Sequence, residues 1–149
     1  MTFQELFDRL GCIDREAASL LEDAGYDSEE GLNGSVHALG DALEDAFLRE
    51  QAEDLLEPFE ILHEELRYLM RPVHGVYTLE QFPNGRYGYY DEDGKEHCFT
   101  CGDGFEAKIC NKYGRWAWNR VRMEHDGAGY FLRCFGGVLL CGLKVRERR

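Results

Sequence analysis

The spacing of the apolar residues changes near the middle of the chain, and this change limits the fold more than any other feature. Up to about residue 72, apolar residues recur every three or four positions, which is typical of amphipathic helices. From Val76 onward they alternate with polar residues between turn sequences, as in short β-strands. Arg71-Pro72 marks the boundary, because a proline disfavours helical geometry in the residue before it. The sequence therefore predicts an α+β protein with two domains, an acidic helical domain over residues 1–72 and a small β-barrel domain over residues 73–149.

About three helices are expected in the first half. Thr2 can cap a first helix that stops at Gly11, and Asp14 can begin a second helix that ends at Gly25. Ser35 begins a third, longer segment. Its apolar residues follow a 4,3,4,3,4,3 spacing and are predicted to form a buried stripe, here called the heptad seam: Leu48, Ala52, Leu55, Phe59, Leu62, Leu66 and Leu69.

A proline and a column of carboxylates accompany the heptad seam. Pro58 is expected to kink the third helix or to start a new one. At about 100° per residue, five glutamates lie almost opposite the seam. These glutamates, here called the acidic column, are Glu50, Glu53, Glu57, Glu60 and Glu64. One interpretation is a solvated face of a helical bundle. The other is an acidic rod that competes with phosphates for a basic groove on a partner, and the scarcity of nearby bases favours it.

The second half predicts a small antiparallel barrel. Turn sequences on both sides enclose a strand over residues 86–90. Further strands are expected over residues 104–111, 115–124, 130–135 and 138–146. Gly136-Gly137 is typical of a two-residue hairpin turn that joins the last two strands. Five or more short strands in about 75 residues favour a closed, strongly curved sheet.

Several motifs in this half carry a resemblance to known domains. The runs Gly102–Glu106, Gly114–Trp116, Val121–Glu124 and Tyr130–Leu132 resemble a Tudor-type barrel. Residues 71–147 also resemble a family of domains of unknown function that plasmids and integrative elements of Gram-positive bacteria carry. The motifs behind this second resemblance are Gly85-Arg86-Tyr87, Cys101-Gly102-Asp103, Glu124–Gly127 and Gly142–Arg146. The resemblance implies an accessory protein of a mobile element, without implying a reaction, and it does not cover the acidic half.

Cys-x-x-Cys-Gly at residues 98–102 is the strongest chemical signal. It is the form of a zinc knuckle, and a structural zinc site needs four ligands. If Gly136-Gly137 is a hairpin turn, Cys134 and Cys141 are diagonal neighbours on one face of the ribbon. The first predicted ligand set for a structural zinc is Cys98, Cys101, Cys134 and Cys141, with Cys110, His97 and His125 as alternatives for the second pair. The competing interpretation is that these cysteines are packing residues, because free cysteine is often buried.

Composition excludes several classes of function. The net charge of −12 argues against a nucleic-acid binder with a generally basic surface. The longest uncharged apolar run, Val138–Leu143, is far shorter than the roughly 20 residues of a membrane span. With no secretory signal expected, the six cysteines indicate a reducing cytoplasm. Nucleotide-binding and hydrolase motifs are missing from the sequence, so an enzyme is not expected.

Two functions fit these features. The favoured hypothesis is a non-enzymatic inhibitor of the anti-CRISPR type, whose acidic column binds a basic groove of a type II CRISPR effector nuclease and blocks target-DNA loading. The alternative is a nucleic-acid- or peptide-binding accessory module that uses aromatic residues of the barrel, among them Tyr87, Trp116 and Tyr130. Neither hypothesis involves a membrane.

Overall fold

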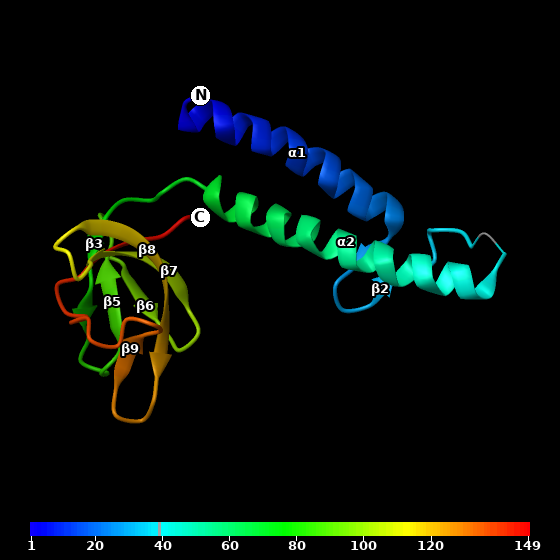
Figure 1. Cartoon of the computed structure of the whole chain (residues 1–149). Helices are drawn as coiled ribbons and strands as arrows, with labels where there is room; N and C mark the ends of the chain where they lie inside the picture. Colours follow the sequence, from blue (N-terminus) through cyan, green and yellow to red (C-terminus); the bar gives the residue numbers. More distant parts are fainter. Residues whose placement is uncertain (39) are drawn as a thin grey trace. The chain divides into compact units, whose positions relative to one another are not determined.

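The computed structural model of the chain describes residues 1–38 and 40–149. The chain divides into two compact units, a helical unit, Met1–Arg71, and a β unit, Pro72–Arg149 (Figure 1). Each unit has its own secondary structure and its own buried residues. Neither described helix has the length and apolar character that crossing a membrane requires.

The helical unit contains two long helices and a small hairpin between them. Their bounds are α1 Phe3–Ala24, β1 Tyr26–Asp27, β2 Gly31–Leu32 and α2 Ala42–Leu69. Thr2 caps α1 through a reciprocal pair of hydrogen bonds with Glu5, and Gly25 ends it in the left-handed conformation that glycine tolerates best. The Asp41 carboxylate caps α2 by accepting two backbone hydrogen bonds. Both predicted ends of this first helical region, Thr2 and Gly25, are confirmed.

The expectation of about three helices is wrong, because the described residues contain two. Gly11 does not stop a helix but is buried inside α1. An interior glycine costs only about 1 kcal/mol relative to alanine, which the packing of its neighbours against α2 outweighs. Pro58 lies inside α2, which continues on both sides of it. A proline there removes one backbone hydrogen bond but does not end the helix.

The two helices lie side by side in opposite directions (Figure 1). The His63 Nδ1 atom is 2.8 Å from an Asp14 carboxylate oxygen, and Leu56 is buried together with Ala24. Leu56 and His63 lie beside the heptad seam, not in it. The predicted burial of the whole seam is therefore wrong for this unit, where Leu55 is 70% exposed. The reason is that α1 packs against a neighbouring column of α2.

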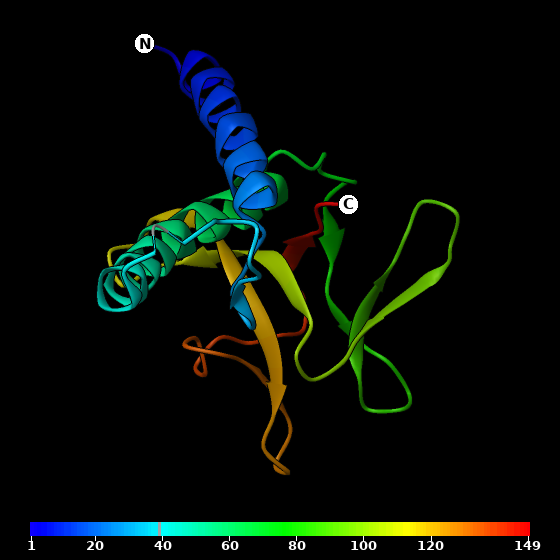
Figure 2. The ribbon, with the colours of Figure 1, turned by 90° about the vertical axis from the view of Figure 1, so that its right-hand side faces the viewer.

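The β unit contains two antiparallel sheets (Figure 2). Five strands follow one another in the order β3-β10-β7-β8-β9, and three in the order β4-β5-β6. Their bounds are β3 Tyr77–Thr78, β4 Glu80–Gln81, β5 Tyr87–Tyr90, β6 Glu96–Phe99, β7 Gly104–Cys110, β8 Trp116–His125, β9 Tyr130–Leu132 and β10 Lys144–Arg146.

The predicted closed, Tudor-like barrel is wrong, because both sheets are open. Among the described residues, no strand pairing joins one sheet to the other. The strand expected over residues 138–146 is reduced to β10, since turns and bends fill much of residues 133–142 and Cys134 adopts a left-handed φ of 65°. Gly136-Gly137 consequently does not join two paired strands. β10 pairs with β7 and β3 instead, so the ring of strands that a barrel requires does not form.

Side chains from both sheets form one apolar core. Phe99 of β6 stacks on Phe105 of β7, with ring centroids 4.1 Å apart. Met123 and Val145 are fully buried beside them. Gly88 of β5 permits the close approach of β6, because a Cβ atom at position 88 would lie 2.1 Å from the His97 carbonyl oxygen. The core therefore faces inward from both sheets, and the opposite face of the five-stranded sheet is left for solvent.

Candidate functional site

The outer face of the five-stranded sheet gathers cations and both tryptophans of the chain. The register of β7 and β8 places Lys108 opposite Trp118 and Cys110 opposite Trp116. Alternate positions on these strands, such as Phe105 and Val121, point into the core. Here the outer face is called the basic face, and its residues are Glu106, Lys108, Trp116, Trp118, Arg120, Arg122, Lys144 and Arg146.

Charge is unevenly divided within the β unit. Residues 72–103 carry six acids and two bases, whereas residues 104–149 carry ten bases and four acids, a net charge of +6. The net charge of −12 for the whole chain hides this segregation. A count of charged residues over residues 104–149 alone would have indicated the basic face.

One buried carboxylate holds two of the cations in place. Glu106 is 5% exposed and accepts hydrogen bonds from Arg146 and from Arg148, whose Nε atom lies 2.6 Å away. Burial raises the pKa of a carboxyl group, but the two guanidinium groups outweigh it and hold the pKa of Glu106 below its ordinary value. The Arg146 guanidinium also lies over the Trp118 ring, 4.2 Å from its centroid. These contacts fix the orientation of a cation on the basic face.

A shallow hollow lies at the edge of the basic face. Its volume is about 230 Å³, and its lining includes Trp116, Leu139, Lys108 and Lys144. Trp116 is 64% exposed and Leu139 is 80% exposed. The Lys144 ammonium donates to the Thr78 hydroxyl at 2.6 Å, which positions this cation. An aromatic plane beside two ammonium groups can stack a planar base and attract the phosphates on either side of it.

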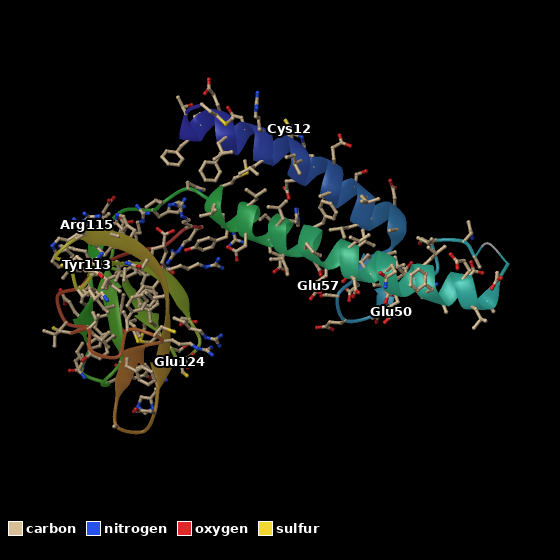
Figure 3. The ribbon with its side chains drawn as sticks, in the orientation of Figure 1. Cys12, Glu50, Glu57, Tyr113, Arg115 and Glu124 are labelled. Carbon is tan, nitrogen blue, oxygen red and sulfur yellow. The ribbon has the colours of Figure 1, made fainter. Side chains whose placement is uncertain are left out.

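The β7–β8 turn continues this surface (Figure 3). Tyr113 and Arg115 lie in the turn, and the Asn111 side-chain oxygen accepts hydrogen bonds from both of their backbone N–H groups at 2.9 and 3.1 Å. The Lys112 ammonium is 5.1 Å from the centroid of the exposed Tyr113 ring. The turn therefore adds an aromatic ring and two more cations to the same end of the sheet.

A polar network elsewhere in the β unit is structural. Tyr89 is buried and donates to Glu147, and Arg149 donates to both residues at 3.1 and 2.6 Å. Burial and the bond to Glu147 raise the pKa of Tyr89 far above its usual range. His97 lies 2.7 Å from Asp91, and this contact is the main cause that lowers the pKa of that carboxyl. The network attaches residues 147–149 to the three-stranded sheet.

The structure does not bring the predicted zinc ligands together. Cys98 lies on β6, and Cys101 follows it with its Sγ atom 3.3 Å from a Glu124 carboxylate oxygen. Cys134 is in a turn, and Cys141 lines the hollow near Trp116. All six cysteines are free, and across residues 1–38 and 40–149 no cluster of three or more His, Cys, Asp or Glu side chains could hold a metal ion. The packing alternative does not fit Cys101, Cys134 and Cys141, because all three are exposed. Zinc binding stays a prediction.

The acidic column is divided between two roles. The Glu53 carboxylate accepts a hydrogen bond from the Leu32 N–H at 3.0 Å, and Arg49 donates to the Leu32 carbonyl at 2.7 Å, so Glu53 anchors the β1–β2 hairpin. Glu60 is half-buried. Glu50, Glu57 and Glu64 are exposed at seven-residue intervals along α2, and Figure 3 labels the first two.

The comparison with known families concerns the β unit. Residues 79–147 match the family model DUF5348, a domain of unknown function. The matched residues include the whole basic face and the hollow. No curated protein and no solved structure matches the chain significantly.

Proposed function

We propose that the β unit binds single-stranded nucleic acid through its basic face. The observation that carries the proposal is the hollow, whose lining includes the exposed Trp116 together with Lys108 and Lys144. Cations attract the phosphate backbone independently of sequence, and an exposed aromatic ring stacks an unpaired base. A duplex keeps its bases inside, so the stacking contribution favours single strands.

The distribution of charge supports this function for the β unit despite the net charge of −12. Of the 29 acidic residues of the chain, 19 lie in residues 1–72, so the negative net charge comes from the helical half. Residues 104–149 have a net charge of +6, and five of their ten cations lie on the basic face: Lys108, Arg120, Arg122, Lys144 and Arg146. Interactions between exposed charges are largely screened beyond about 10 Å at 0.1 M salt.

Binding of a labelled single-stranded oligonucleotide of about 16 nucleotides to the full chain tests this function. Affinity is measured by fluorescence anisotropy from about 50 mM salt upward. Trp116→Ala is expected to weaken binding roughly 5- to 150-fold, the usual contribution of one stacked base. Lys108→Glu with Lys144→Glu should reduce the salt dependence of log K by about 1.4, because two phosphate contacts are lost.

The matched control reverses two cations outside the basic face. Arg86 and Lys95 lie in the turns on either side of β5, and replacing both with glutamate changes the net charge by the same amount. This control should keep most of the affinity. Equal weakening by the two double variants, or no binding by the unsubstituted chain at about 50 mM salt, would contradict the proposal.

The acidic column supports a second candidate function. Glu50, Glu57 and Glu64 are exposed along one line of α2, and none of the three makes an ion pair within the described residues. An unneutralised line of carboxylates can occupy a groove that normally receives phosphates. On this basis the chain would act as an anti-CRISPR inhibitor from a mobile element that blocks DNA loading by a type II CRISPR effector nuclease.

A further inference from the structure

We propose that the helical unit pairs with the helical unit of a second copy of this chain, through one broad apolar face, to form a four-helix bundle. This inference concerns residues 1–71 and is independent of nucleic-acid binding by the β unit. Few apolar residues are buried in this unit, although it contains two long helices. Among the described residues these are Ala17, Ala24, Leu32, Leu56 and Leu66.

Both helices carry an apolar stripe with heptad spacing, and each stripe is exposed in part. In α2 it is the heptad seam, of which Leu48, Leu55, Phe59 and Leu69 are exposed. In α1 the apolar positions 3, 6, 10, 13, 17, 20 and 24 have the matching 3,4,3,4,3,4 spacing, and Phe3, Leu6, Ile13 and Leu20 are exposed. A sustained heptad pattern is the pattern of helices that pack along a partner.

The two stripes lie on the same side of the helical unit. Asp14 and His63 mark the line where α1 contacts α2. Ile13 comes one residue before Asp14, so its side chain is rotated by about 100° around α1 from the contact line. Leu62 comes one residue before His63, so its side chain is rotated by about 100° around α2 from the same line. Because the two helices run in opposite directions, the residue that precedes the contact residue points to the same side of the helical unit in both helices. The exposed stripes consequently form one continuous apolar face.

The exposed glutamates of the acidic column lie on the other side. Glu64 comes one residue after His63, about 100° around α2 in the opposite sense, and Glu57 and Glu50 continue this line. The heptad seam and the stripe of α1 contain no charged residue. Pairing through the apolar face therefore keeps these three glutamates of both copies in solvent. Repulsion between the two acidic units remains at long range, and salt weakens it.

The size of the face suits a dimer. α1 has 22 residues and is about 33 Å long, and two helices side by side are about 20 Å wide. The flat area is then roughly 660 Å², close to the roughly 800 Å² per partner of a standard interface. A face that pairs with its own copy about a two-fold axis needs no other sequence to complement it, and two antiparallel hairpins joined in this way make a four-helix bundle.

Sedimentation equilibrium of the full chain tests the dimer. The expected mass is twice the 17.2 kDa of one chain, with association that strengthens as salt is raised. Leu55→Glu should weaken dimerisation by about 100-fold or more, because each dimer loses two buried leucines. Ile61→Glu is the matched control: Ile61 is 55% exposed on the same helix but points away from the apolar face, so the dimer should persist.

Thermal melting provides a second measurement that does not depend on a variant's ability to fold. The melting temperature of the helical signal should rise with protein concentration, since dissociation accompanies unfolding. A monomer at the highest soluble concentration, a melting temperature independent of concentration, or equal effects of Leu55→Glu and Ile61→Glu would overturn the proposal. A monomer would mean that another partner, or nothing, covers the apolar face. If the chain forms the dimer but does not bind the oligonucleotide, only the nucleic-acid proposal is refuted.

Discussion

Glu106→Gln is expected to destabilise the β unit by about 3 kcal/mol, the lower end of the cost of breaking a buried ion pair. The glutamine has the same shape, so no cavity forms. It removes the charge that faces Arg146 and Arg148 and turns an N–H₂ group toward one of these guanidinium groups. Both guanidinium groups are about four-fifths buried, so water compensates for little of the loss.

Urea unfolding followed by tryptophan fluorescence measures this change in the β unit alone, because both tryptophans of the chain, Trp116 and Trp118, lie on β8. In a thermal experiment the same loss corresponds to a fall in melting temperature of roughly 12 to 24 °C. Glu124→Gln is the control. Its partner Arg122 is 3.2 Å away but largely exposed, and such surface pairs contribute at most about 1 kcal/mol.

The effect of pH on Glu106 has a definite sign. Its pKa in the folded protein lies below the ordinary value of 4.5. The stabilisation is therefore fully present above about pH 4.5 and is lost as the pH falls through the folded pKa. The gap in stability between the unsubstituted chain and Glu106→Gln should narrow in acid. A Glu106→Gln change no larger than that of Glu124→Gln at pH 7 would refute the role given to this ion pair.

Two further predictions concern the metal and the acidic column. If the chain binds a structural zinc, elemental analysis of untagged protein should find about one zinc per chain, and a strong chelator should lower the melting temperature; Cys98→Ala and Cys101→Ala should each abolish the metal. No metal and no effect of the chelator would leave the six cysteines without a metal role. If the acidic column inhibits a nuclease, replacing Glu50, Glu57 and Glu64 together with lysine should abolish salt-sensitive binding to a type II effector, and unchanged affinity would remove that mechanism.

The sequence predicted correctly those helix and strand ends that are set by residues close to them in the chain. The Thr2 cap and the Gly25 end of α1 follow from hydrogen bonding within one turn of the helix. The turn at Asn84-Gly85 also places β5 where the sequence predicts a strand, because turn geometry is set by the residues of the turn.

The parts that could not be predicted depend on distant contacts. Gly11 and Pro58 resemble helix ends by themselves, but packing between α1 and α2 keeps both inside helices. Residues 138–143 have the composition of a strand, yet none of them lies in one, and the strand that pairs with β7 begins only at Lys144. The sequence also does not show which column of α2 contacts α1, because Leu55 and Leu56 are equally apolar.

The candidate site was predicted only in part. The aromatic residues of the second half were recognised as a possible stacking surface, but the segregation of cations over residues 104–149 was not. The pairing of Lys108 with Trp118, and the position of Lys144 beside Trp116, depend on strand register. The hydrophobic pattern and the turn geometry set the register of neighbouring strands, but β7 and β10 are far apart in the sequence, so their pairing is not set by a turn.

Tryptophan fluorescence during titration with a single-stranded oligonucleotide tests the central claim most directly. A base that stacks on the exposed Trp116 ring should quench its emission in a saturable way at about 50 mM salt, and added salt should reverse the effect. Trp116→Phe, which keeps an aromatic plane, should retain binding by anisotropy but lose most of the quenching. An emission that does not change while the oligonucleotide binds, or that changes equally in Trp116→Phe, would contradict binding at this face.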